Sequence, residues 1–242
     1  MMIAGFTVCD VHATPGAFAI AGSGASCDLR LDQDPTIGPC HLFVQSEELD
    51  DGGVRLRVLD IDSAHGFGLA DGSSTRSIAT TGPLVLTLGA YVIIALPNQA
   101  SHAPTLPPLA GACASDGRIH ARARVVETPL SELSGLYVMT FTSPQGCAVV
   151  RATAADLDRG VLVGRPPLAT SRGLDAILNV SISRTHLLLL RGRSGCVVND
   201  LATMNGTFHR GRRIRALDLE DEGIELVLGT TKSVRMRWRA CR

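Results

Sequence analysis

The sequence predicts an all-β protein made of two β-sandwich domains in tandem, joined by a proline-rich linker. Short runs of Val, Leu and Ile are separated by turns rich in glycine, of which the chain has 25 among its 242 residues. Frequent short apolar runs with such turns are typical of β-sandwiches. Apolar residues at helical spacing do not extend over a useful length, and a stretch with four prolines divides the chain into two parts of similar size.

Strand patterns recur through both parts. Residues 234–239 alternate between apolar side chains and arginines, so one face of this strand is expected to pack inward and the other to face water. Helix candidates are short, at 154–158 and 130–133. Further strands are expected at 119–126, 187–190 and 196–198 in the second part and at 6–11, 17–21, 42–44, 54–59, 84–88 and 91–96 in the first.

The predicted linker begins at Pro97, and its four prolines lie between Pro97 and Pro108 with Ser, Ala and Thr between them. Proline has no N–H for a β-ladder and restricts the residue before it, so this stretch is expected to be extended. We therefore expect one domain at 1–96, a linker at 97–117 and a second domain at 118–242.

Charge is distributed unevenly, although the formal net charge of the whole chain is zero. Residues 1–110 contain 4 basic and 11 acidic residues, a net charge of −7, whereas residues 111–242 contain 19 basic and 12 acidic residues, a net charge of +7. A basic half is expected to attract an anionic ligand. A compatible interpretation is that the acidic and basic halves dock on each other.

The seven cysteines include no CxxC pair and no His/Cys cluster with zinc-like spacing, so neither a metal site nor another cofactor is expected. Free thiols indicate a reducing compartment. Four of them lie in apolar runs and are expected to be inert core residues: Cys9, Cys40, Cys147 and Cys196. The start of the chain lacks a signal-peptide pattern, and the apolar runs are too short to span a bilayer. We therefore expect an intracellular protein, cytoplasmic or nuclear, without membrane contact.

The second half carries polar motifs that suit binding of a phosphorylated side chain. A phosphate ester has about −1.5 to −2 charges and three acceptor oxygens, so it is best held by guanidinium, hydroxyl and amide donors on rigid loops. Asn205 combines donors with an acceptor, which suits a peptide main chain. The motifs are, in order, Gly164–Arg165, Ser183–Arg184–Thr185–His186, Asp200–Leu201, Thr203 and Asn205–Gly206–Thr207.

This order and spacing resemble the forkhead-associated (FHA) domain family over roughly residues 135 to 240. The resemblance implies a β-sandwich that binds phosphothreonine-containing proteins. It implies that Arg165 and Ser183 contact the phosphate or shape its loop, that Arg184 and Thr203 contact the phosphate, and that Asn205 binds the peptide main chain. Gly164, His186 and Gly206 would be structural, with His186 a buried loop anchor. The alternative is that Ser183 and Thr203 only cap turns and Arg165 is solvated.

One departure from the family pattern concerns peptide selectivity. The family's second Asn-Gly turn is here Arg210–Gly211, so an arginine stands where an asparagine often contacts the peptide. Because a guanidinium pairs with carboxylates, we expect Arg210 to favour acidic residues after the phosphothreonine, unless it simply points into water.

The first half resembles a degenerate FHA-like repeat. Gly22–Ser23 stands at the Gly-Arg position, Gly38–Pro39–Cys40–His41 at the Ser-Arg-x-His position, and Gly89 at the position of Gly229. The glycines and the histidine are kept, whereas the phosphate-binding side chains are not. We therefore expect residues 1–96 to bind no phosphate and to serve as a scaffold or protein-binding surface. The alternative is a plain β-sandwich unrelated to the FHA family.

Other function classes are disfavoured. No motif of hydrolases, P-loop proteins or metalloproteases is present, and the histidines are scattered, so we expect no enzyme. The basic run at 209–215 could contact a nucleic-acid backbone, but aromatic residues make up only 4% of the chain and are not interleaved with these charges. The main alternative to a phosphothreonine-dependent adaptor is a structural scaffold or assembly subunit that uses the FHA fold without phosphate dependence.

Overall fold

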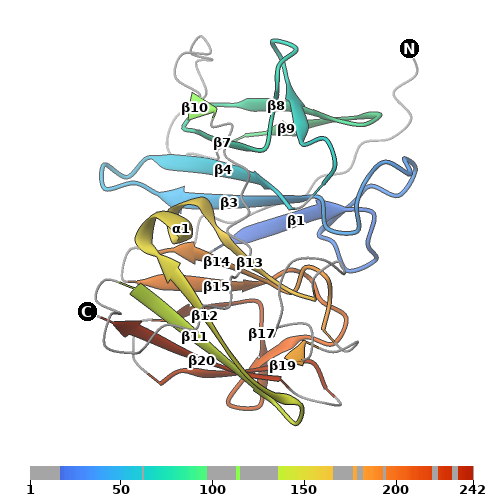
Figure 1. The fold of residues 1–242 in the computed structure, drawn as a ribbon. Helices are drawn as coiled ribbons and strands as arrows, with labels where there is room; N and C mark the ends of the chain where they lie inside the picture. Colours follow the sequence, from blue (N-terminus) through green and yellow to red (C-terminus); the bar gives the residue numbers. More distant parts are fainter. Residues whose placement is uncertain are drawn as a thin grey trace. The chain divides into compact units, whose positions relative to one another are not determined.

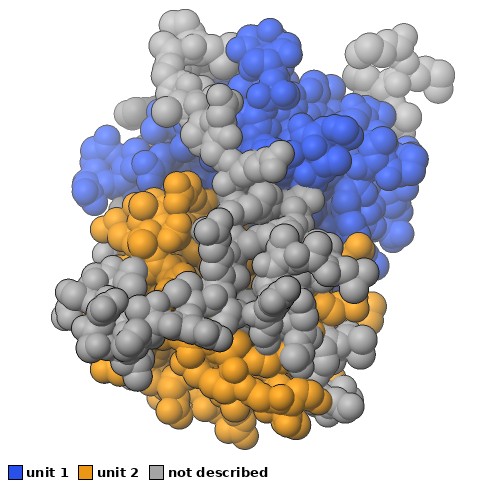
Figure 2. Space-filling model, viewed as in Figure 1, with its two compact units in different colours: residues 1–119 blue, residues 120–242 orange. Residues whose placement is uncertain are grey.

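A computed structural model confirms the all-β prediction. The chain divides into two compact units, residues 1–119 (unit 1) and residues 120–242 (unit 2), which Figure 2 distinguishes by colour. The structure describes residues 17–61, 63–96, 113–114, 136–165, 177–178, 182–192, 195–219, 223–230 and 234–241.

Unit 2 is a sandwich of two antiparallel sheets (Figure 1). The six-stranded sheet has the order β12-β11-β20-β19-β16-β17, and the four-stranded sheet has the order β13-β14-β15-β18. The strands are β11 (Leu136–Ser143), β12 (Gly146–Thr153), β13 (Val161–Val163), β14 (Leu187–Arg191), β15 (Cys196–Asp200), β16 (Thr207–His209), β17 (Arg212–Ile214), β18 (Ala216–Leu219), β19 (Glu225–Leu228) and β20 (Val234–Cys241).

Both sheets of unit 2 contribute to one apolar core. Phe141, Met236 and Trp238 come from the six-stranded sheet, and Leu189 and Val198 come from the four-stranded sheet, and all five are buried. Burying such side chains between two sheets is the main source of stability in a sandwich. The expected alternation of β20 is confirmed, because its apolar residues are buried and its arginines are exposed.

The predicted helix at 154–158 is confirmed as α1 (Ala154–Arg159). Thr153 caps it, since its side chain accepts a hydrogen bond from the Asp156 N–H while the Asp156 carboxylate accepts one from the Thr153 N–H. This reciprocal pair satisfies two backbone donors that a helix start leaves unpaired. Buried Leu157 holds the helix on the core.

Unit 1 also has two sheets. The first has the order β10-β7-β4-β3-β1-β2, and the second has the order β6-β5-β8-β9. The strands are β1 (Phe18–Gly22), β2 (Leu29–Arg30), β3 (Leu42–Glu48), β4 (Val54–Asp60), β5 (Phe67–Leu69), β6 (Ser74–Thr75), β7 (Ser77–Thr80), β8 (Leu84–Leu88), β9 (Tyr91–Ala95) and β10 (Cys113–Ala114).

The two units share a strand order. The series β1-β3-β4-β7 in unit 1 corresponds to β13-β14-β15-β18 in unit 2, and the series β6-β5-β8-β9 corresponds to β17-β16-β19-β20. Strand register agrees as well, because Leu42 pairs with Asp60 in unit 1 as Leu187 pairs with Asp200 in unit 2. These pairings define equivalent positions in the two units, and they agree with the sequence alignment of the two halves.

The outward faces of β9 and β20 differ at equivalent positions. The outward side chains of β20 are Arg235, Arg237 and Arg239, and the first two pair with Glu225 on β19 at 3.0 and 3.6 Å. In unit 1 the positions equivalent to Glu225 and to the three arginines are aliphatic and exposed: Val85 on β8 at 37%, Val92 on β9 at 64%, Ile94 on β9 at 60% and Leu96 just after β9 at 66%. One unit therefore turns an ion-paired surface outward and the other an apolar one.

The predicted linker contains an element that the sequence did not indicate. Residues 113–114 form β10, which pairs with β7 at the edge of a unit 1 sheet. The rest of the linker lies outside the described residues, as do the expected strands at 6–11 and 119–126 and the expected helix at 130–133. The domain boundaries at 96 and 117 remain predictions.

Candidate functional site

The Gly-Arg pair of unit 2 follows β13 and lies directly against the loop that precedes β14. The Arg165 N–H donates to the Ser183 carbonyl at 2.9 Å, and the His186 N–H donates to the Val163 carbonyl at 2.9 Å. A Cβ atom on Gly164 would lie 2.0 Å from the Arg184 carbonyl oxygen, so only glycine fits there. The structure therefore brings Arg165, Ser183 and Arg184 together.

His186 anchors this loop from inside, as the sequence predicted. Its side chain is fully buried, and its Nδ1 accepts a hydrogen bond from the Ser183 N–H at 3.2 Å. Burial lowers the pKa of His186 because it disfavours the imidazolium, and the nearby Asp200 carboxylate only partly offsets this. The neutral ring keeps Nδ1 available as an acceptor, which fixes the main chain at Ser183.

A second loop, between β15 and β16, is fixed by the buried Asp200 carboxylate. Asp200 accepts hydrogen bonds from the Thr203 N–H at 2.9 Å, the Thr203 hydroxyl at 2.8 Å and the Thr207 hydroxyl at 2.6 Å. The Thr203 Oγ1 in turn accepts from the Gly206 N–H at 3.1 Å. These bonds hold the loop that carries Asn205 in one conformation.

Thr203 is only 3% exposed, and its hydroxyl both donates and accepts within the loop. A direct contact with phosphate, which the family resemblance implied, does not fit this geometry. The sequence identified Thr203 correctly as a motif residue but not the direction of its side chain. We therefore assign Thr203 to positioning Asn205 rather than to the ligand.

The outer surface of these loops contains the groups that can reach a ligand. Arg184 is exposed, and Ser183, Arg165 and Asn205 are partly exposed. The Nε of Arg165 is buried and has no hydrogen-bond partner among the described residues. Between Thr203 and Asn205, Met204 is 87% exposed, which sequence reasoning missed because the motif leaves this position open.

The backbone conformation and close packing of the Asn-Gly turn explain why a glycine stands at position 206. Gly206 has a φ of +72°, and a Cβ there would lie 2.8 Å from the Arg213 Nε. Arg213 donates to the Thr203 carbonyl at 2.5 Å and so supports the loop. Sequence analysis also missed this role of Arg213, which has no motif signal.

Among the residues that the structure describes, no group of three or more His, Cys, Asp or Glu side chains could hold a metal ion. Likewise, none of the described helices is long and apolar enough to cross a membrane. What the loops offer is a cluster of cationic, hydroxyl and amide groups, which suits an anion attached to a peptide.

Comparison with known families gives a match over residues 161–229, described as the FHA domain. The chain carries an FHA domain. FHA domains are phosphopeptide-binding protein–protein interaction modules and not enzymes, and the matched region contains the Gly-Arg, Ser-Arg-x-His and Asn-Gly-Thr motifs in their loops.

Solved FHA domain structures resemble part of the chain. One is the FHA domain of CT664 protein from Chlamydia trachomatis, with 23% identity, a TM-score of 0.34, and coverage of 43% of this chain and 95% of that chain. Another is Rv1747 FHA-1 from Mycobacterium tuberculosis, with 24% identity, a TM-score of 0.33, and coverage of 44% and 98%. Comparison with curated proteins gave no match.

The turn between β16 and β17 of the FHA domain is made by Arg210 and Gly211, which confirms the predicted basic turn. Their φ angles are +49° and +76°, and Arg210 is exposed. A left-handed φ is unfavourable for arginine and much easier for asparagine or glycine. Arg210 therefore occupies a strained position at the rim of the domain.

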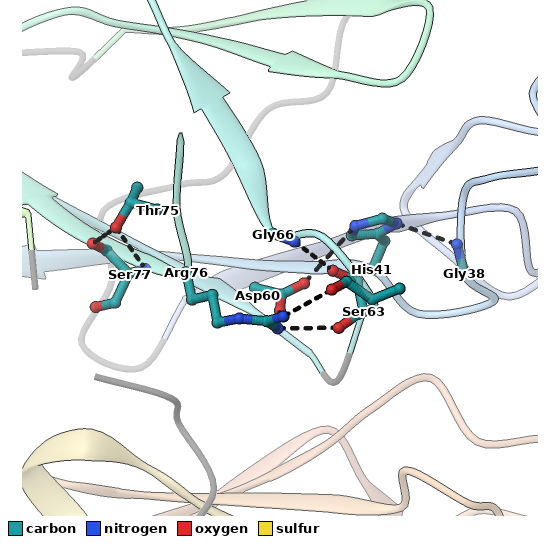
Figure 3. A network of polar contacts seen from close by, with 9 residues as sticks. Gly38, His41, Asp60, Ser63, Gly66, Thr75, Arg76 and Ser77 are labelled. Atoms are coloured by element: carbon teal, nitrogen blue, oxygen red, sulfur yellow. Dashed lines mark hydrogen bonds and ion pairs between the residues drawn. The ribbon is translucent and has the colours of Figure 1, made fainter. Parts of the chain in front are cut away.

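Unit 1 repeats the loop framework of the FHA domain. His41 donates from its main chain to the Ala21 carbonyl, and its Nδ1 accepts from the Gly38 N–H at 3.1 Å, as His186 does in unit 2. Likewise, the Gly66 N–H donates to the Ser63 hydroxyl at 2.9 Å (Figure 3). The assignment of unit 1 as a degenerate FHA repeat remains a prediction, because the family match is confined to unit 2.

The buried carboxylate is neutralised differently in unit 1. Asp60, equivalent to Asp200, pairs with the Arg76 guanidinium at 2.6 Å, and Arg76 also donates to the carbonyls of Ser63 and Ala64 at 2.9 Å each (Figure 3). His41 Nε2 lies 3.7 Å from Asp60, too far for a hydrogen bond. The Arg76 guanidinium thus donates to the buried carboxylate in unit 1, whereas threonine hydroxyls donate to the equivalent carboxylate in unit 2.

Proposed function

We propose that the FHA domain of unit 2 binds a phosphothreonine-containing segment of another protein, and that the chain acts as an adaptor. Arg165, Ser183 and Arg184 would hold the phosphate, and Asn205 would hydrogen-bond the peptide main chain after the phosphothreonine. The observation that carries this proposal is the partly exposed Arg165, whose buried Nε lacks a partner among the described residues while its main chain is bonded to Ser183.

The physical argument rests on this guanidinium. A buried N–H without a hydrogen bond is unfavourable, and a bound anion would supply the missing acceptor to the Arg165 Nε. Two oxygens of a phosphate can accept hydrogen bonds from one planar guanidinium at the same time. The third oxygen can then accept a hydrogen bond from a hydroxyl such as that of Ser183. Arg184, exposed beside Ser183, adds a second positive charge.

The remaining motif residues support the site without touching the ligand. His186 fixes the main chain of Ser183, and Asp200 with Thr203 fixes the turn that carries Asn205. A site held by buried hydrogen bonds has less conformational entropy to lose when the peptide binds. The preference for threonine over serine is part of the proposal and is supported by the family resemblance.

We further propose that unit 1 does not bind phosphate. Its loops place Ser23, Gly38 and Pro39 where the FHA domain has Arg165, Ser183 and Arg184. None of the three replacements carries a positive charge, and residues 1–110 have a net charge of −7, which repels anions. Unit 1 would instead serve as a scaffold or protein-binding surface.

The test uses the full chain and a phosphothreonine peptide selected from an oriented library. Arg165→Ala and Ser183→Ala should each weaken binding by about 2–4 kcal/mol in titration calorimetry, because each removes a donor to a partly buried phosphate. The matched control is Arg191→Ala, an exposed arginine paired with Asp158 at the far end of β14, which should bind normally.

Unchanged affinity in both site variants would contradict the proposal. Equal binding of the phosphorylated and unphosphorylated peptide would favour the alternative, a scaffold that uses the FHA fold without phosphate dependence.

A further inference from the structure

Two cysteines of unit 1 lie on loops that the main chain holds together. The Ser23 N–H donates to the Gly38 carbonyl at 2.9 Å, and the Gly24 N–H donates to the Pro39 carbonyl at 3.0 Å. Cys27 follows the first segment, and Cys40 follows the second. The loop between them is short, so bringing them together costs little additional chain entropy.

The thiol of Cys27 lies against the main chain next to Cys40. The Cys27 thiol donates to the Pro39 carbonyl at 2.9 Å, and this carbonyl belongs to the peptide bond that joins Pro39 to Cys40. The Cys40 side chain is near enough to lower the pKa of Cys27 by hydrogen bonding. Both are free of disulfide bonds and partly exposed, so the expectation that Cys40 is an inert core residue is wrong.

We propose that Cys27 and Cys40 are a reversible modification site that forms an intramolecular disulfide by exchange with a low-molecular-weight disulfide such as oxidised glutathione. The Cys27 thiolate attacks one glutathione sulfur, forming a mixed disulfide and releasing one glutathione thiolate. Cys40 then loses its proton and attacks the Cys27 sulfur, which releases the second glutathione. Two protein thiols are oxidised to one disulfide, and one oxidised glutathione is reduced to two thiols.

The local chemistry fits these roles. The hydrogen bond from Cys40 lowers the pKa of Cys27 below that of an ordinary thiol, although burial opposes this effect. A larger thiolate fraction makes Cys27 the attacking group, and Cys40 beside it is placed to resolve the mixed disulfide. Cys196 shows the opposite case, because burial raises its pKa and no small disulfide can reach it.

Close packing of the loops depends on Gly24. A Cβ atom at this position would lie 2.7 Å from the Pro39 carbonyl oxygen and 3.5 Å from the Cys27 sulfur. Gly24→Ala should therefore push the two loops apart, although both cysteines remain in the chain. This variant separates the geometry of the pair from the mere presence of two cysteines.

The test equilibrates the full chain in glutathione buffers of increasing oxidised fraction, followed by acid quenching, alkylation and digestion with trypsin. Arg30 is the only basic residue before Arg55, so trypsin separates Cys27, in peptide 1–30, from Cys40, in peptide 31–55. We expect these peptides to become disulfide-linked and to separate again in reduced glutathione. The link should be lost in Cys27→Ser and in Cys40→Ser.

Cys9 shares the first peptide with Cys27, so Cys9→Ser serves as the matched control and should retain the link. Gly24→Ala should require a more oxidising buffer for half-maximal linking. The proposal is overturned if no linked peptide forms under conditions in which the exposed Cys147 carries glutathione. It is equally overturned if the link persists in Cys27→Ser and disappears in Cys9→Ser.

Discussion

Units 1 and 2 hold equivalent loops with matching hydrogen bonds but fill them with different side chains. In unit 2, Asp200 accepts hydrogen bonds from the main chain and hydroxyl of Thr203 and from the hydroxyl of Thr207, and Arg184 on the neighbouring loop is exposed. In unit 1, Asp60 draws Arg76 inward instead. The comparison teaches that the loop framework is common to both units, whereas the proposed anion binding depends on which side chains stand at the positions of Arg165, Ser183 and Arg184.

The largest effect should come from breaking the buried ion pair of unit 1. Arg76→Ala leaves the fully buried Asp60 carboxylate without its cation, which should cost about 3–5 kcal/mol of unfolding free energy in unit 1. Arg235→Ala removes an exposed arginine of unit 2 that pairs with Glu225 at 3.0 Å, and it should cost about 0–1 kcal/mol because both partners are solvated. Hydrogen exchange followed by mass spectrometry reports each unit separately, and equal losses would break the comparison.

A smaller difference in stability between the two units is expected when the hydroxyl group that accepts a hydrogen bond from the loop glycine is removed. Thr203→Ala removes a donor to Asp200 and the acceptor for the buried Gly206 N–H, which should cost unit 2 about 1–3 kcal/mol. Ser63→Ala removes a single, partly exposed acceptor in unit 1 and should cost about 0.5–1.5 kcal/mol. The same exchange measurement checks both, and a larger loss in Ser63→Ala would contradict the roles assigned here.

Acid should destabilise both units through their buried histidines. Burial lowers the pKa of His41 and of His186 from the ordinary 6.5, so below that value the unfolded chain binds protons that the folded chain does not. The stability that each neutral histidine contributes to the folded state is therefore complete above pH 6.5 and is lost as the pH falls towards the pKa of the folded state. The free energy of unfolding should fall by at most about 1.4 kcal/mol per pH unit for each histidine.

Urea unfolding followed by fluorescence of Trp238, the only tryptophan, measures the acid effect in unit 2. Asp200 and Arg213 are the charged groups that act on His186, and Asp60, Arg76 and His65 are those that act on His41. His209→Asn, at a partly exposed histidine of β16, is the control and should retain the pH dependence. A midpoint of unfolding that stays constant on acidification would contradict the prediction.

The smallest effect concerns the turns at the ends of the two β-hairpins. Unit 1 makes its turn with Asp71 and Gly72, where the positive φ falls on glycine, whereas unit 2 places Arg210 at a φ of +49°. Arg210→Asn should stabilise unit 2 by up to about 1 kcal/mol because asparagine tolerates this conformation better. Thermal unfolding of the wild type and of Arg210→Asn measures this difference.

The same variant tests peptide selectivity. If Arg210 contacts the peptide, wild type should prefer Asp over Lys at the third position after the phosphothreonine by about 0–1 kcal/mol, and Arg210→Asn should lose this preference. A preference that survives the substitution would exclude Arg210 as the selecting residue.

The strands and the loop positions of both units could be predicted from the sequence, because glycines at tight turns and the alternation of apolar and polar residues in strands are local sequence patterns. Gly164 and Gly206 are required by close approach and by a positive φ, and the apolar–arginine alternation of β20 needs only a period of two. These features depend on neighbours in the chain, so the alignment of the two halves located the equivalent loops.

What failed depended on contacts between distant segments. The burial of Thr203 follows from the position of Asp200 beneath it, and the pairing of Asp60 with Arg76 joins residues on different strands. The two-residue strand β10 is too short for any periodic pattern. Cys147 was expected in the core because its neighbours are apolar, but it lies exposed near the β11–β12 turn.

The outward faces of β9 and β20 show how freely one side of a strand can change while the other stays fixed. The inward positions are constrained by the neighbours that they pack against, whereas the outward positions are constrained only by solvent or by a partner. Three substitutions, at Arg235, Arg237 and Arg239, would give this face of β20 aliphatic residues like Val92 and Ile94 of β9 and Leu96 just after it. A sandwich can therefore acquire a new surface in single-residue steps on the outward side of a strand while the packing of its interior stays the same.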